Sequence, residues 1–350
     1  MGFVLSIVVW SAATMLHAAA NSLLAFGAFR AILGVAEAGN WPGATKANAE
    51  WFPINERALA QGIFNSGAAI GGIVSAPIIG LLFVFLGSWQ ATFVAIGALG
   101  FLWLLPWLIV YKSGPDAHPW ITEEERQYIL TGQRNAETNE VADYAPDTKE
   151  ILSRKESWGV ILASFFIDPI WWLFVGWLPI YLLNTYGFGV EEIAVYAWIP
   201  YVGAMFGAWF GGLLAGNRLK AGWTVNRTRK TVIALGGLIM LVSLLLTTQA
   251  ATPLTAVLIM AVILFGFQTA VGNIQTLPSD FYSGKSVGSL AGFAGTAAKL
   301  AVVGLNFLIP VITVNSYTPA FVVGAALAIL TVLSIFILCP NIKPLHSRTA

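Results

Sequence analysis

The sequence has few charged residues for its length. Of its 350 residues only 10% are charged, whereas 57% are hydrophobic, and the mean hydropathy is +0.75. A soluble core cannot hide so much apolar surface, which excludes an ordinary soluble domain. The net charge of +1 is close to zero and says nothing about partners. No nucleic acid is expected among the partners.

Cysteine and histidine are equally scarce. The one cysteine, Cys339, cannot form an internal disulfide, and His17, His118 and His346 are too scattered to suggest a metal cluster. No nucleophile and base are recognisable, and the one stretch like a phosphate-binding loop, at 284–286, lacks its leading glycine. We therefore expect neither an enzyme nor an ATP-driven pump, and no cofactor or metal.

Long apolar runs, by contrast, are plentiful. Each has about the 20 residues that a membrane-spanning helix needs. Ten runs are predicted as spans, at 2–20, 22–45, 57–86, 89–111, 158–186, 193–216, 229–249, 253–277, 286–313 and 316–340. The sequence therefore predicts an all-α membrane protein in a lipid bilayer. Its parts are an N-terminal bundle at 1–111, a cytoplasmic linker at 112–157, and a C-terminal six-helix bundle with a cytoplasmic tail at 158–350.

Lysine and arginine are absent from every second connection between these spans. All of the 18 basic residues except Arg30 and Lys299 lie in the connections after the second, fourth, sixth and eighth spans or in the C-terminal tail. Because lysine and arginine gather in cytoplasmic loops, both termini are predicted to be cytoplasmic. Within the linker, the Thr-x-x-Glu capping box that opens 122–130 predicts a short surface helix.

Glycines recur at every fourth position in two of the predicted spans. Gly203, Gly207 and Gly211 form one such row, and Gly67 and Gly71 form another. This spacing lets helix backbones approach closely, so helix packing is the first interpretation. A backbone that flexes at these positions is the alternative.

Four ionisable residues remain at membrane depth, away from the ends of the predicted spans: Arg30, Glu37, Asp168 and Lys299. Each costs roughly 2.5–3.5 kcal/mol at a helix centre, so each should face protein or a water-filled cavity. Arg30 and Glu37 are about two turns, or ~10 Å, apart on one helix face, too far for a direct bond. This spacing suits an anion on Arg30 and a proton on Glu37, with anion binding favouring protonation. Alternatively, the pairs Arg30–Asp168 and Glu37–Lys299 only hold helices together.

Uncharged polar and aromatic residues in the spans allow two interpretations. Gln61 and Asn65, one turn apart, suit the hydroxyls of a sugar, and they suit hydrogen bonds between helices equally well. Trp171, Trp172 and Trp177 suit stacking on a sugar ring. Packing or an interfacial position explains each of these tryptophans at least as well.

Three stretches carry a family resemblance. They are FRAILGVAEAGNWPGATKANAEWFPINERA at 29–58, DPIWWLFVGWLPIYL at 168–182 and WIPYVGAMFGAWFGG at 198–212. They resemble the anion:cation symporter branch of the major facilitator superfamily, and its bacterial hexuronate permeases most of all, from about residue 2 to about residue 340. The resemblance implies a major facilitator fold in the bacterial inner membrane. It also implies alternating-access symport of a small anionic sugar acid, such as a hexuronate, with protons.

The resemblance also assigns roles to residues. Arg30 is expected to bind the substrate carboxylate, Glu37 to carry the proton, and Asp168 to act as a second titrating or cavity-lining group. The other substrate-binding candidates are Gln61, Asn65, Trp171, Trp172, Thr296 and Lys299. The resemblance assigns no counterpart to Lys299, so its assignment rests on burial alone.

The family has twelve spans in two six-helix halves, whereas this sequence predicts four plus six. The first two helices of the family pattern, which contribute to one wall of the cavity, have no counterpart here. We therefore expect a carrier that lacks its first two helices, and the alternative is a truncated, non-transporting remnant of such a carrier.

Overall fold

The computed structural model describes residues 2–111, 114–133 and 144–346, and within these ranges the secondary structure is helical. The N-terminal helices are α1 (Gly2–Leu16), α2 (Leu23–Glu37), α3 (Asn40–Trp51), α4 (Ile54–Leu86) and α5 (Trp89–Val110), with a 3-10 turn, η1 (His17–Ala19). The polar segment holds α6 (Glu123–Gly132) and α7 (Thr148–Ser153). The C-terminal helices are α8 (Lys155–Tyr186), α9 (Val190–Tyr196), α10 (Ile199–Lys220), α11 (Val225–Thr247), α12 (Pro253–Phe281), α13 (Gly284–Ile312) and α14 (Thr318–Leu338).

Nine helices of the described chain are long and apolar enough to cross a membrane. The count is ten when α4, which bends by 44° between Ile54–Ser75 and Ile78–Leu86, is included as one span. The predicted all-α architecture with ten spans is therefore confirmed. The second span is longer than predicted, because α2 and α3 together run to Trp51. It ends there because the residue before a proline disfavours helix, and Phe52, which precedes Pro53, is extended.

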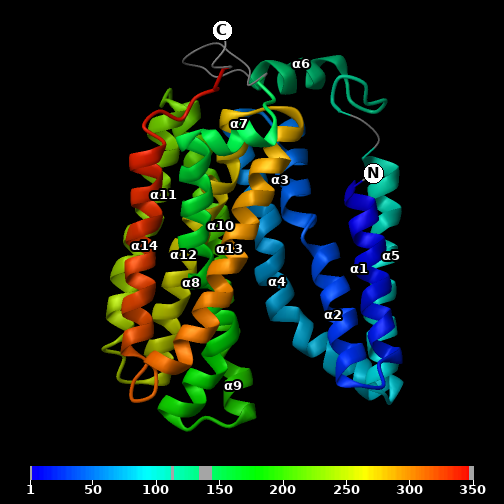
Figure 1. The fold of residues 1–350 in the computed structure, drawn as a ribbon, viewed down its shortest axis with the longest axis vertical. Coiled ribbons are helices and arrows are strands. Elements are labelled where there is room, and N and C mark those ends of the chain that lie inside the picture. Colours follow the sequence, from blue (N-terminus) through cyan, green and yellow to red (C-terminus); the bar gives the residue numbers. More distant parts are fainter. Residues whose placement is uncertain (1, 112–113, 134–143, 347–350) are drawn as a thin grey trace.

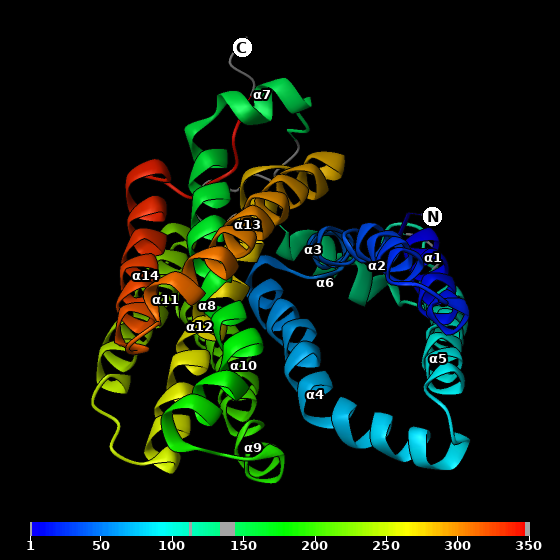
Figure 2. The ribbon, with the colours of Figure 1, turned by 60° about the horizontal axis from the view of Figure 1, so that its bottom comes forward.

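The helices form two bundles that meet at one end of the molecule (Figure 1). Helix α4 packs along α10 through its first half, where Gly62 lies against the carbonyl of Ala208. Farther along, α4 runs away from the C-terminal bundle (Figure 2), and its Leu81 and Phe85 side chains are largely exposed. The linker and the C-terminal tail lie at the end where the bundles meet. The two halves are therefore closed at that end and apart at the other.

The glycine row on α10 lies in a close helix contact, as predicted. A Cβ atom at Gly203, Gly207 or Gly211 would overlap the main chain of α12 at Ala261, Phe265 or Thr269. On α4, Gly67 and Gly71 have no neighbouring atom of the described chain within 4 Å of such a Cβ. The packing interpretation therefore holds for the first row and not for the second.

The linker contacts both halves. The Thr122 hydroxyl accepts a hydrogen bond from the Glu125 amide at 3.2 Å and caps α6, so the predicted surface helix is present. Tyr128 on α6 donates a hydrogen bond to Glu56 of the N-terminal half at 2.5 Å. Helix α7, which the sequence did not predict, leads into α8 of the C-terminal half. The linker therefore covers the end at which the halves meet.

Candidate functional site

Arg30 and Glu37 lie on α2, and both side chains are exposed. The helix begins at Ser22, whose hydroxyl accepts a hydrogen bond from the Ala25 amide at 3.1 Å. Arg30 is therefore near the middle of α2 and Glu37 is its last residue. Among the described residues, neither one has an ion-pair partner within 4 Å. Both groups are free to meet a ligand or water.

Asp168 of α8 and Lys299 of α13 form an ion pair, with 2.7 Å between Oδ2 and Nζ. The Lys299 ammonium also lies 4.8 Å from the centre of the Trp172 ring, which is a cation–π contact. Thr296, one turn before Lys299, is exposed and donates to the main-chain oxygen of Gly292. The alternative pairs that join these groups to Arg30 and Glu37 are not formed. Instead, three predicted site residues meet within the C-terminal half.

The other tryptophans of α8 are held by neighbouring side chains. Trp171 packs against Tyr201 and Phe267, with ring centres 5.8 and 5.5 Å apart. Trp177 donates from its ring nitrogen to Asn306 of α13 at 3.1 Å. Trp172 is therefore the one of the three that lies beside the ion pair.

Gln61 and Asn65 belong to a cluster of four carboxamides between the halves. Both donate to the side-chain oxygen of Gln275 on α12, each at 2.8 Å. Asn48 of α3 donates to the side-chain oxygen of Gln61, also at 2.8 Å. Gln61 and Asn65 are almost fully buried. In this arrangement they make the hydrogen bonds between helices that were one of the two interpretations, while Asn48 and Gln275 were not predicted from the sequence.

Two arginines at the starts of predicted spans, Arg57 and Arg229, are buried where the halves meet. Arg229 of α11 pairs with Asp280 of α12, with 2.9 Å between Nε and Oδ2. It also donates to the side chain of Asn273 at 3.3 Å and, across to the other half, to the main-chain oxygen of Ile54 at 3.4 Å. Taking a charged guanidinium out of water is costly, so a buried arginine requires ion-pair and hydrogen-bond partners such as these.

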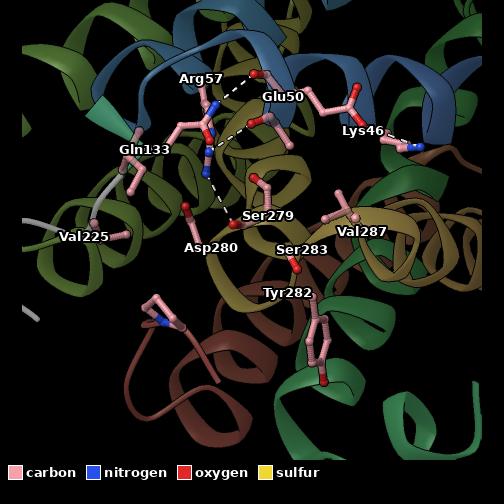
Figure 3. Close-up of a pocket in the computed structure, with 14 residues that line it drawn as sticks. Lys46, Glu50, Arg57, Gln133, Val225, Ser279, Asp280, Tyr282, Ser283 and Val287 are labelled. Atoms are coloured by element: carbon pink, nitrogen blue, oxygen red, sulfur yellow. Dashed lines mark hydrogen bonds and ion pairs between the residues drawn. The ribbon is translucent and has the colours of Figure 1, made fainter. Parts of the chain in front are cut away.

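Arg57 of α4 makes the matching connection from the N-terminal half. Its guanidinium donates to the main-chain oxygens of Phe52 and Ala49 within its own half, at 3.1 and 3.0 Å, and to that of Ser279 on α12, at 3.3 Å. Figure 3 shows Arg57 pointing from α4 toward Ser279, with Asp280 beside it. We refer to Arg57, Arg229 and Asp280 as the interhalf clamp.

A cavity of about 120 Å³ lies beside the interhalf clamp. Lys46 and Glu50 of α3 line it from one half, and Tyr282 and Val287 line it from the other (Figure 3). None of the predicted site residues lines this cavity. The sequence signal for the clamp was available, because Arg57 lies in the WFP-x-x-ER stretch of the family resemblance.

The arrangement therefore has two parts with different chemistry. Charged side chains that solvent can reach, Arg30, Glu37 and Lys299, lie within the spans of both halves. A buried set of ion pairs and hydrogen bonds joins the halves at one end.

A family model described as Major Facilitator Superfamily matches residues 1–304. The chain belongs to this superfamily. It is 32% identical over 347 residues to the hexuronate transporter of Escherichia coli K12, covering 98% of this chain and 79% of that protein. It is 36% identical over 249 residues to the galacturonate transporter of Dickeya chrysanthemi, covering 69% of each. The resemblance to hexuronate permeases is confirmed.

The structure has the same fold as solved members of the superfamily. It superimposes on the proton:xylose symporter XylE, bound to 6-bromo-6-deoxy-D-glucose, with a TM-score of 0.69 over 98% of this chain and 79% of that one. The sequences are 15% identical, so this likeness concerns the fold alone. Together, the family match and the spans make the chain an integral membrane protein of the major facilitator fold.

Proposed function

We propose that this chain is a secondary active transporter that carries a sugar acid, such as a hexuronate, together with protons. The observation that carries the proposal is that solvent-accessible charges lie within the spans of both halves: Arg30 and Glu37 on α2, and Lys299 on α13. Charges at this depth are costly and usually serve the passage of an ion or substrate. Transport by alternating access places the site between the halves.

The roles of the charged residues follow from their chemistry. The planar guanidinium of Arg30 binds a carboxylate through two parallel hydrogen bonds. Glu37, an exposed carboxylate two turns away on the same helix, carries the proton. Asp168 is the second titrating or cavity-lining group, and its contact with Lys299 supports a position in the cavity.

The remaining candidates surround the sugar ring and its hydroxyls. Trp172, beside Lys299, offers a face for stacking. Thr296 is exposed one turn away, and Trp171 packs behind on Tyr201 and Phe267. Gln61 and Asn65 bind substrate hydroxyls only when the halves separate, because both side chains are hydrogen-bonded to Gln275 in the arrangement described here.

The distribution of basic residues supports the rest of the proposal. We place the protein in the bacterial inner membrane, because the hexuronate and galacturonate transporters that it resembles are bacterial proteins. Both termini and the linker then face the cytoplasm, because lysine and arginine gather at that side. The interhalf clamp closes the cytoplasmic end, and the site opens to the outside.

The test is uptake of radiolabelled galacturonate by proteoliposomes that contain the full 350-residue chain. An inward proton gradient should drive accumulation that saturates with concentration, and a protonophore should abolish the accumulation. Neutral galactose should compete poorly, because it has no carboxylate for Arg30. Uptake that does not saturate, or that ignores the proton gradient, would contradict a proton-coupled carrier.

A further inference from the structure

The ion pair between Lys299 and Asp168 is open to solvent, unlike the pair in the interhalf clamp. The Lys299 side chain is 60% exposed and that of Asp168 is 23% exposed, whereas Arg229 and Asp280 are 0% and 2% exposed. Lys299 lies near the middle of α13 and Asp168 near the middle of α8. A ligand from solution can therefore reach the ammonium directly.

The exposed side of this pair faces water. A lysine at the centre of a span is costly where it contacts hydrocarbon. Lys299 is too far along α13 to reach the end of the helix, because about 13 residues, or ~20 Å, separate it from Ile312. Its ammonium remains beside Asp168 and Trp172, where both an anion and an aromatic face are available.

The ammonium has two independent partners, which allows one of them to be exchanged. The Trp172 ring, 4.8 Å away, attracts the cation whether or not Asp168 is present. Exposed ion pairs are weak, since water competes for both charges. They typically change the ratio of paired to separated groups by roughly twofold to fivefold. A carboxylate that arrives from solution can therefore take the place of Asp168.

We propose that the Asp168 carboxylate pairs with the Lys299 ammonium when no ligand is bound. A sugar acid then binds by replacing the Asp168 carboxylate with its own. Lys299 then binds the single carboxylate of a hexuronate together with Arg30 of the other half, and Asp168 is an internal competitor for Lys299. This inference rests on the proposed transport of sugar acids and adds a specificity-determining pair to it. If the pair only held α8 to α13, removing the Asp168 carboxylate would instead weaken binding, and removing both charges would restore it.

The experiment measures galacturonate binding to the detergent-solubilised full chain by isothermal titration calorimetry. Asp168→Asn removes the competitor and keeps its size, so affinity should rise by roughly twofold to fivefold. Lys299→Gln should lower affinity by roughly tenfold or more, as for loss of a charge-assisted hydrogen bond. The double variant should bind as weakly as Lys299→Gln alone.

Two controls separate this effect from general changes in charge or stability. The methyl ester of galacturonate has no carboxylate, so its binding should respond little to either substitution. Glu123→Gln removes the carboxylate of another exposed pair, the one with Arg126 on α6, and should leave affinity unchanged. Thermal melting of each variant shows whether it is folded.

The outcomes distinguish this inference from the proposed function. If Asp168→Asn weakens binding and the double variant recovers it, the pair is structural and the inference is wrong. If Lys299→Gln binds as the unchanged chain does, the inference is again wrong, and this holds even where Asp168→Asn fails to fold. If the unchanged chain binds no galacturonate at all, the proposed substrate class is wrong instead.

Discussion

Among the proposed site residues, Arg30 sets the most specific geometric requirement for the substrate. A guanidinium grips a carboxylate with two parallel hydrogen bonds, whereas an ammonium is a point charge. Arg30→Lys should therefore weaken galacturonate binding by ~1–3 kcal/mol, or roughly tenfold to a hundredfold, although the charge is kept. Competition binding on the solubilised chain measures the loss. Unchanged affinity would mean that the fork of Arg30 does not hold the carboxylate.

Glu37 allows a test of proton coupling that leaves shape unchanged. Glu37→Gln removes the titratable group but keeps a side chain of the same size that forms hydrogen bonds. Uphill accumulation driven by a proton gradient should fail, while exchange of labelled for unlabelled galacturonate across the membrane should persist. Both are measured in the same proteoliposomes. Accumulation at the full level would exclude Glu37 as the proton carrier.

The residues that the sequence predicted and those that it missed differ in a physical way. Arg30, Glu37, Asp168 and Lys299 stand out because a charge within an apolar run is costly. Arg57 and Arg229 look like ordinary loop residues, because they lie where a span begins and many basic residues are solvated there. Only the packing of α4 and α11 against α12 shows that they are buried. Contacts between distant segments are what the sequence could not supply.

At the scale of helices, the glycine row of α10 offers a matched pair of variants. Gly207→Ala adds a Cβ that would overlap the main chain at Phe265, so α10 and α12 must move apart. Such overpacking typically costs about 1–3 kcal/mol, and the melting temperature should fall. Gly67→Ala meets no described atom within 4 Å and replaces glycine within a helix, so it should melt at the same or a higher temperature. Equal destabilisation would contradict the packing interpretation.

The spans themselves were largely predictable, and the errors lie at their ends. Hydropathy over about 20 residues decides that a helix crosses the bilayer, so the long apolar runs were found. The second span was ended at residue 45 because the residues that follow are polar, yet the helix continues to Trp51. Those polar residues include Asn48, whose side chain donates a hydrogen bond to Gln61 and therefore does not face lipid. The helix therefore continues past residue 45 because of such contacts and ends at Trp51 because of Pro53, and hydropathy indicates neither.

At the scale of the whole molecule, orientation in the membrane is testable with single cysteines. The native Cys339 gives little background, because burial raises the pKa of its thiol to about 12. Gly189→Cys and Ala251→Cys lie in connections without lysine or arginine, so an impermeant thiol reagent outside intact cells should label both. Lys149→Cys, in the linker, should react only after permeabilisation. The reverse pattern would overturn the proposed orientation.

The bonds that join the halves affect how fast the halves can separate and close again in the proposed transport cycle. Hydrogen bonds from Arg57 to Ser279, from Arg229 to Ile54, and from Gln61 and Asn65 to Gln275 all cross between the halves. Separation at this end must break these bonds together, although Arg57 keeps its bonds to Phe52 and Ala49 and Arg229 keeps its pair with Asp280. The exchange should be all-or-none and slow strongly on cooling. In the proposed transport cycle, the passage of cargo from one side of the membrane to the other should therefore slow in a cold membrane.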